Sequence, residues 1–401
     1  PATTPETTTP ETTTPNPDTG CISNCGGMPP PPPPCTAGAV TSNAPNIMFD
    51  SNFGTSGVWT LVESGKNIMI QEAIVGNDGK GYVLVNVAPT MSMGPRSDVS
   101  RLYRLNTDGS NDSTWGTNTN GYVEVSGNLN FMTLGSNGSF ILSGSTFANY
   151  MQTPVLVRLT STGALDTTWG NGGTVSFPAP PSGSMQMIAD IAAGPSGSVY
   201  VNVGTSTFGQ NGMVFTYSVF NVTTTGTVDT NFGTNGALSV QGRDIQSDST
   251  GALYVWVSDI MTSTSTMRKF DANGSLVGSF GNNGILALSA RINDAKIIGA
   301  HMYLLLAESL SGGGMMGPPS SKTTVARYNR TTGVLDANFA TAGVSTVFAS
   351  ASADAMRLVP LPDGSFAVLG ITFGMNGASA FLLLMDSAGA ISANLPSTGA
   401  T

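Results

Sequence analysis

Few residues of this chain are of the types that catalyse reactions. Its 401 residues include a single histidine, His301, which lies inside the apolar run AHMYLLLA. Acid–base catalysis by such a group needs a positioned partner, and the acidic residues are spread through turns without marking a pair. The sequence contains no motif of nucleophilic hydrolases, zinc proteases or phosphate-binding loops. We therefore expect His301 to be structural, and we expect no enzyme activity, no catalytic residue, no metal site and no cofactor.

The cysteines are confined to the first 45 residues, at Cys21, Cys25 and Cys35. This spacing, with no histidine nearby, does not suit zinc. In an oxidising compartment one pair could form a disulfide, which leaves the third thiol free or available for an intermolecular bond. The sequence therefore predicts at least one disulfide and leaves its pairing open.

The same 45 residues differ in composition from the rest of the chain. They contain 12 of the 24 prolines and no lysine or arginine. TTPETTTPETTTP is a Thr/Pro repeat, and a polyproline run consists of Pro29, Pro30, Pro31, Pro32, Pro33 and Pro34. Such a segment has too few apolar residues for a core and favours extended conformations. It is a solvated linker, an O-glycosylated stalk, or an arm whose polyproline run docks on a neighbouring subunit.

The charge composition excludes one class of partner. Charged residues make up 10% of the chain, lysine and arginine number 15, and the net charge is −9. Nucleic acid binding needs clustered cations and is not expected.

No apolar stretch of about 18 residues is present, so no membrane span is expected. A weakly charged surface rich in Thr, Ser, Asn and Gly is typical of extracellular or cell-surface proteins, in which Asn111, Asn137, Asn221, Asn273 and Asn329 would be candidate glycosylation sites.

A short motif recurs along the rest of the chain. Six copies start 48 to 63 residues apart. They are FDSNFGTSG at 49, NDSTWGTNTNG at 111, LDTTWGNGG at 165, VDTNFGTNG at 228, LVGSFGNNG at 276 and LDANFATAG at 335. Each unit holds four short apolar runs separated by turn residues, without long helical periodicity. Six units of four antiparallel strands are the pattern of a β-propeller.

Each part of the motif has an expected role in this fold. The glycines permit tight turns, and the aspartate is expected to accept hydrogen bonds from backbone amides of its own turn. The aromatic residue should pack as a wedge between blades; the six are Phe53, Trp115, Trp169, Phe232, Phe280 and Phe339. The turn NTDGSND has spaced oxygens but lacks the distal glutamate of a calcium loop, and so calcium is not expected.

These motifs resemble the delta-60 repeat, a family of bacterial β-propellers. LPDGSFAVLGITF, VLVRLTSTGALDTTWGNGG and ARYNRTTGVLDANFATAG carry the resemblance, which covers about residues 46–395. The fourth and fifth units depart from it, so the strand register there is open. The resemblance implies an extracellular or envelope propeller and no particular activity.

The sequence thus predicts three parts. Residues 1–45 form an extended Thr/Pro-rich arm, residues 46–395 an all-β, six-bladed propeller of four-stranded antiparallel blades, and residues 396–401 a C-terminal tail. The chain enters at a motif copy (Phe49–Gly57) and leaves after the strand that should precede one (Phe381–Ala390). Because the two ends together complete one unit, we expect the N-terminal strand to pair into the last blade and close the ring.

One face of the propeller is a candidate interaction surface. The loop after the third apolar run of each unit should emerge on the same side, and these loops are rich in methionine and phenylalanine. Such residues either fill gaps beneath the loops or contact a partner. The candidates are Met91, Met93, Phe147, Met151, Phe208, Met315, Met316, Phe373 and Met375.

These features favour a secreted or cell-surface structural protein. It would be a self-associating subunit of an extracellular filament or layer, or an adhesin, that assembles through its N-terminal arm. The alternative is a ligand-binding, lectin-like propeller that binds glycans and is displayed on a stalk.

Overall fold

The computed structural model describes most of the chain beyond the N-terminal arm. The described residues are 52–55, 58–76, 78–89, 99–116, 120–148, 151–178, 180, 182–209, 212–259, 261–309, 321–351, 353–361, 363–374 and 377–394. Their regular structure is β-strand apart from two 3₁₀ turns, Ser136–Gly138 and Pro195–Gly197. Within these ranges, no helix is long and apolar enough to cross a membrane.

The first three blades are four-stranded sheets in which each strand pairs antiparallel with the next along the chain. The first blade contains β1 (Lys66–Val75), β2 (Gly81–Pro89), β3 (Val99–Leu105) and β4 (Tyr122–Ser126). The second contains β5 (Asn128–Leu134), β6 (Phe140–Ala148), β7 (Met151–Leu159) and β8 (Thr174–Ser176). The third contains β9 (Ser184–Ala193), β10 (Val199–Gly209), β11 (Gly212–Val222) and β12 (Leu238–Val240).

The last three blades repeat this order, including the two units that depart from the family pattern. The fourth contains β13 (Asp244–Ser247), β14 (Leu253–Asp259), β15 (Thr264–Phe270) and β16 (Ile285–Leu288). The fifth contains β17 (Arg291–Ile298), β18 (His301–Ser309), β19 (Ser321–Asn329) and β20 (Val344–Ala351). The sixth contains β21 (Ala353–Pro360), β22 (Phe366–Gly374), β23 (Gly377–Met385) and β24 (Ile391–Asn394).

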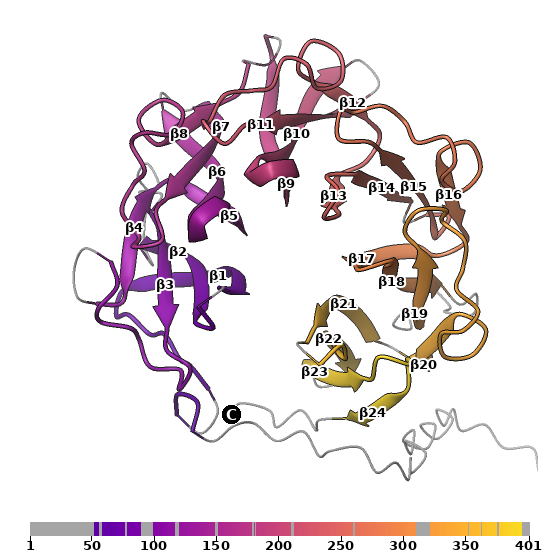
Figure 1. Cartoon of the computed structure of the whole chain (residues 1–401). Helices are drawn as coiled ribbons and strands as arrows, with labels where there is room; N and C mark the ends of the chain where they lie inside the picture. Colours follow the sequence, from indigo (N-terminus) through magenta and orange to yellow (C-terminus); the bar gives the residue numbers. More distant parts are fainter. Residues whose placement is uncertain are drawn as a thin grey trace, which may run out of the picture. The chain divides into compact units, whose positions relative to one another are not determined.

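The predicted six-bladed β-propeller is confirmed. The blades follow one another around a centre in chain order, and the first strand of each blade is the innermost (Figure 1). These inner strands contact one another from β1 to β21. Each blade therefore brings its inner strand to a common central region, where side chains from different repeats can meet.

Five of the six motif aromatics are buried between successive blades. Trp115, Trp169, Phe232, Phe280 and Phe339 are at most 2% exposed. Each belongs to a core cluster that joins two successive blades. Phe53 is only partly buried and packs on the first blade alone.

The motif aspartate has the predicted role and a second one. Asp166 Oδ1 accepts the backbone N–H of Thr168 at 3.2 Å, which is the expected turn. Its other oxygen lies 2.7 Å from an Arg158 nitrogen, and the guanidinium carbon of Arg158 lies 5.3 Å from the ring centroid of Trp169. The same triad recurs as Asp112 with Arg104 and Trp115, and as Asp336 with Arg327 and Phe339. The motif thus ties a turn, the third strand and the wedge together.

Gly226, in the turn before the motif copy at 228, shows why this turn contains glycine. Gly226 has a φ of +81°, and a Cβ there would collide with the backbone of Gly170 in the motif of the preceding repeat. The Gly170 N–H donates to the carbonyl of Thr225 in this turn at 2.9 Å. Close approach of two backbones therefore explains why this turn has a glycine at position 226.

The predicted ring closure by the N-terminal segment is wrong. All four strands of the last blade come from residues 353–394, and β24 pairs with β23 through Leu383–Met385. The segment from Asn52 to Leu61 lies instead against the first blade. Because β24 follows β23 after a short turn, its pairing closes a small loop and costs less chain entropy than pairing across the whole chain.

Candidate functional site

A recess lined by amide side chains lies where the first blade meets the second. Its volume is about 350 Å³. The lining residues come from β1, β2, β3 and β5 and are Asn67, Met69, Gln71, Asn86, Val87, Ala88, Val99, Asn128 and Asn130. Five of them carry amides and none is charged. We call this site the amide recess.

A buried hydroxyl anchors the amides. Ser100 Oγ, fully buried in β3, lies 2.6 Å from Asn86 Oδ1 and 2.7 Å from the Gly127 carbonyl oxygen. Asn86 Nδ2 donates to Oδ1 of Asn128 and, at 3.3 Å, to Oδ1 of Asn130. Both asparagines, Asn128 and Asn130, accept these hydrogen bonds through Oδ1, and their Nδ2 atoms donate to no group in the described part of the chain. Their amide nitrogens are therefore available as donors to a ligand.

Two β-bulges place amides in the recess. The register of β1 against β2 shifts between Ile70 and Glu72, so Gln71 is the extra residue. The register of β5 against β6 shifts between Leu129 and Phe131, so Asn130 is the extra residue. A bulge re-aims the side chain that it carries. Regular alternation along a strand does not reveal such a shift, which is why the sequence did not mark this site.

Five of the six inner strands contain such a bulge, and the residue that follows the bulge is ionisable in four of them. Residues directly after the bulged one are Glu72, Phe131, Asp190, Asp294 and Arg357, on the inner strands of five blades. In the fourth blade the equivalent position is Asp244, which precedes the residue that Asp190 contacts. We call these six positions the bulge ring.

Three carboxylates of the bulge ring bridge neighbouring blades. In each case an oxygen accepts a backbone N–H from the inner strand of the next blade. The pairs are Glu72 with Met132, Asp190 with Ile245, and Asp294 with Leu358. Asp190 also accepts the N–H of Ile191, and Asp294 the N–H of Ala295. These oxygens are engaged by the backbone, which indicates a structural role.

Burial raises the pKa of three acids of the bulge ring. Desolvation raises the pKa of Asp190 to about 7, and it raises the pKa of Glu72 and of Asp244 above the ordinary value. Asp294 is paired with Lys296, whose Nζ lies 3.2 Å from Oδ1. Within the ranges described above, no group of three or more His, Cys, Asp or Glu side chains is arranged to hold a metal ion. A short sequence signal was available for these acids, since each of IQEAI, IADIA and INDAK places one inside an apolar run.

The predicted interaction face is described only in part. Phe208 is 65% exposed at the tip of the β10–β11 hairpin, beside the exposed Met213 and Phe215. Phe147, Met151 and Phe373 lie on β6, β7 and β22, and their side chains are not described. Met91, Met93, Met315, Met316 and Met375 lie outside the described residues. Phe208 does not line the amide recess.

The other candidate residues lie elsewhere. Cys21, Cys25 and Cys35 and the polyproline run fall outside the described residues, so the disulfide and the docking arm stay predictions. His301 begins β18, and its Nδ1 lies 3.6 Å from Asp336 Oδ2, which Arg327 Nε contacts at 2.9 Å. His301 belongs neither to the amide recess nor to the bulge ring, and its structural role stays a prediction.

Comparison with known proteins gives no family. No model of a known protein family matches the chain, and no curated protein matches it. Similar solved structures include a polysaccharide lyase (11% identity, 84% of this chain and 81% of that chain, TM-score 0.43). A β-1,3-galactosidase with galactodeoxynojirimycin (9%, 72% and 95%, 0.36) and a Cellvibrio cellulosa α-L-arabinanase complexed with arabinohexaose (14%, 65% and 93%, 0.31) are also similar. The resemblance to the delta-60 repeat stays a prediction.

The prediction that the chain is not an enzyme is contradicted by these similarities, since the similar structures are those of enzymes. The sequence argument relied on short linear motifs, which do not exclude an enzyme because a propeller assembles its central residues from separate repeats. At identities of 9 to 14% the likeness is one of fold alone, and it assigns no reaction to this chain.

Proposed function

We propose that this protein is a secreted or cell-surface binding protein whose propeller holds a neutral saccharide in the amide recess. The observation that carries the proposal is the set of five amides around an uncharged recess. Amides donate and accept hydrogen bonds, as sugar hydroxyls do. Met69, Val87 and Val99 supply apolar surface for the C–H groups of a sugar ring. The volume of about 350 Å³ lies at the lower end of the range of small-ligand sites and suits a short saccharide.

The rest of the sequence fits a displayed binding protein. The surface is weakly charged, and the Thr/Pro-rich residues 1–45 have the composition of a stalk. In this proposal the protein acts as an adhesin, with the alternative being a structural subunit of an extracellular filament or layer. Binding of a saccharide distinguishes the adhesin from a purely structural subunit.

Binding to arrayed neutral glycans, followed by calorimetry with the best oligosaccharide, tests the proposal. Gln71→Ala and Asn130→Ala should each weaken binding about tenfold, because one lost hydrogen bond to a ligand costs about 1–2 kcal/mol. Gln186→Ala is the matched control, since Gln186 is an amide on the inner strand of the third blade and does not line the recess. Thermal unfolding of all three variants checks that the fold is kept. The proposal fails if no glycan binds or if both recess variants bind as well as the control.

A further inference from the structure

The segment from Asn52 to Leu61 makes the contacts of a fourth strand that lacks its blade. The N–H of Gly54 donates to the carbonyl of Asp108, in the turn after β3, at 2.6 Å. Four later copies of the motif make the same bond to the turn of the next blade: Gly170 to Thr225, Gly233 to Asn273, Gly281 to Thr332 and Ala340 to Ala388. The first copy therefore sits on the first blade as the later copies sit on theirs.

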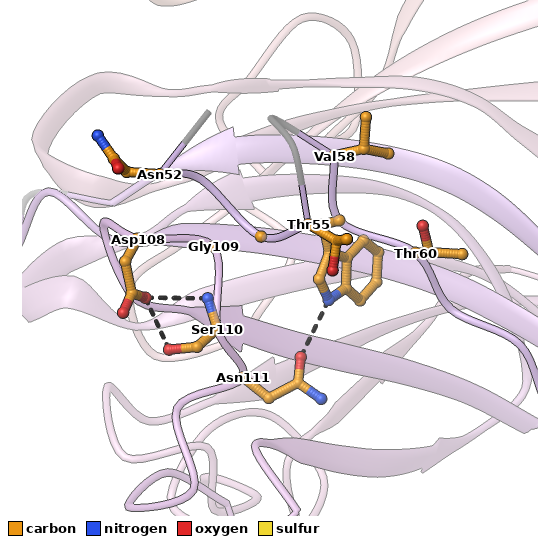
Figure 2. Close-up of a pocket in the computed structure, with 10 residues that line it drawn as sticks. Asn52, Thr55, Val58, Thr60, Asp108, Gly109, Ser110 and Asn111 are labelled. Atoms are coloured by element: carbon orange, nitrogen blue, oxygen red, sulfur yellow. Dashed lines mark hydrogen bonds between the residues drawn. The ribbon is translucent and has the colours of Figure 1, made fainter. Parts of the chain in front are cut away.

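Side chains hold this segment in place. Trp59 packs edge to face on Tyr103, with ring centroids 5.5 Å apart, and its Nε1 donates to Asn111 Oδ1 at 3.0 Å. Phe53 and Leu61 pack on the same face of the first blade. Figure 2 shows Asp108 and Asn111 of the first blade beside the segment. The segment and the turn that contains Asp108 together line a pocket of about 450 Å³.

The outer edge of this segment has no strand beside it. In the second blade, the residues after the motif form β8, which pairs with Val155–Val157 of β7. Val58–Leu61 follows its motif at the same distance, yet it pairs with no strand in the described part of the chain. Val58 is 50% exposed and Val62 is 82% exposed. Val58 exchanges both of its backbone hydrogen bonds with Thr55, so the backbone groups of Trp59 and Leu61 point to the opposite edge, to which a strand can add.

The last blade offers the complementary edge. Met385 pairs with Ile391 as Leu159 pairs with Leu165, so Phe381–Leu383 of β23 corresponds to Val155–Val157 of β7. β24 covers this stretch only at Leu383, which pairs with Asn394. Phe381 and Leu382 have no described strand beyond β23 on this side.

Among the described residues, the first and last blades share no cluster of buried side chains. Five clusters of buried residues each join two successive blades. The cluster on the remaining face of the first blade contains Phe53, Trp59 and Leu61 and no residue of the last blade. Among the described strands, no contact between these two blades compares with those between neighbours.

We propose that copies of this chain associate head to tail, with Val58–Leu61 of one copy added as a strand beside Phe381–Leu383 of another. In the register of the second blade, Thr60 lies opposite Phe381, and Asn394 moves away from Leu383. The partner is a second copy because this chain carries both the edge of Val58–Leu61 and the matching edge of Phe381–Leu383. Within one copy, the first and last blades that carry these edges share no described core cluster. Such a contact joins two different surfaces, so association continues as an open filament or closes as a ring of copies. This proposal does not depend on saccharide binding.

Sedimentation velocity of the full chain over a range of concentrations gives the first test. Wild type should associate reversibly, and Trp59→Pro should shift association to at least tenfold higher concentration, because in this register the N–H of Trp59 faces Leu382 as that of Val175 faces Leu156, and proline removes it. Trp59→Ala is the matched control, since it loses the same side-chain contacts but keeps the N–H, and it should associate more readily than Trp59→Pro. A wild-type chain that stays monomeric, or equal association of both variants, overturns the proposal.

A crosslinking experiment separates pairing between copies from pairing within one. Cys21, Cys25 and Cys35 are replaced by serine, and Thr60→Cys and Phe381→Cys are introduced in separate chains. Mixing the two chains under mild oxidation should give a disulfide-linked heterodimer, because paired strands bring opposite residues within disulfide distance. A chain that carries both substitutions and forms only an intramolecular disulfide would overturn the proposal in favour of ring closure. Melting curves of each variant confirm that Phe381→Cys keeps the fold.

Discussion

The backbone N–H of Ile245 in the fourth blade donates to Asp190 Oδ2 in the third blade at 2.8 Å. The other oxygen of Asp190 accepts the N–H of Ile191, also at 2.8 Å. A single carboxyl group thus links two inner strands at a position where burial raises its pKa to about 7. Proton binding at this group is therefore coupled to the contact between blades, and so to the stability of the propeller.

We predict that the propeller loses stability as the pH rises from about 4 to about 7. The unfolded chain has an aspartate pKa of about 3.9, so in this window folded Asp190 holds a proton that the unfolded state has released. Glu72 and Asp244, whose pKa values burial also raises, act in the same direction. Carboxyls with a lowered pKa, such as Asp112 and Asp336, change the stability only below about pH 4, where it falls as they bind protons. Urea unfolding at pH 5 and pH 8 should give the smaller free energy at pH 8.

Asp190→Asn isolates the contribution of this carboxyl. The amide does not titrate, so the difference in unfolding free energy between pH 5 and pH 8 should shrink. Glu124→Gln is the control for the substitution itself, because Glu124 is exposed on β4 and lies outside the bulge ring. A pH dependence that is identical in wild type and Asp190→Asn would falsify the assignment to Asp190.

A second prediction concerns the bridge between the last two blades. Asp294→Ala should destabilise the protein by about 2–4 kcal/mol, because it leaves the N–H groups of Leu358 and Ala295 without their acceptor. Asp294 is 7% exposed, so water does not readily replace it. Asp354→Ala, at a more exposed acid of β21, should cost less than half as much. Urea unfolding measures both, and equal losses would show that the bridge adds nothing.

The N-terminal arm gives a third prediction. At least one disulfide should form among Cys21, Cys25 and Cys35 in material from an oxidising compartment, because these cysteines are close in sequence. Mass spectrometry of peptides from non-reduced, alkylated protein measures it. Three alkylated thiols in such material would rule the disulfide out.

The repeating features of the fold could be predicted from the sequence, and the sites could not. Trp169 and its equivalents recur at one place in every unit, and all but Phe53 are buried between two blades. Gln71 and Asn130 reach the amide recess only because bulges interrupt strand alternation, and a bulge leaves no periodic signal. Glu72, Asp190 and Asp294 meet the next blade through backbone groups, which side-chain patterns do not show.

The prediction of ring closure by the N-terminal segment was wrong for a related reason. The segment Phe49–Gly57 reads as the motif that completes a unit, and Gly54 does make the contact of such a motif. The sequence could not show that Ile391–Asn394 would take the edge of β23. ISANLPSTG at 391 aligns with LDANFATAG at 335, with Ala, Asn and the final Gly at the same positions, so the chain carries a seventh copy of the motif that the repeat count missed.

The wedge residues give the last prediction, which also reports on the contact between the first and last blades. Trp169→Ala should cost about 3–5 kcal/mol, because Trp169 is 1% exposed and packs between two blades. Phe53→Ala should cost only about 1–2 kcal/mol, because Phe53 is partly buried against one blade. Phe208→Ala, at an exposed hairpin tip, is the control and should cost less than about 0.5 kcal/mol. Urea unfolding of dilute protein, at which copies are separate, measures all three. If Phe53→Ala costs as much as Trp169→Ala, the first blade is packed on both sides within one copy, and head-to-tail association loses its open face.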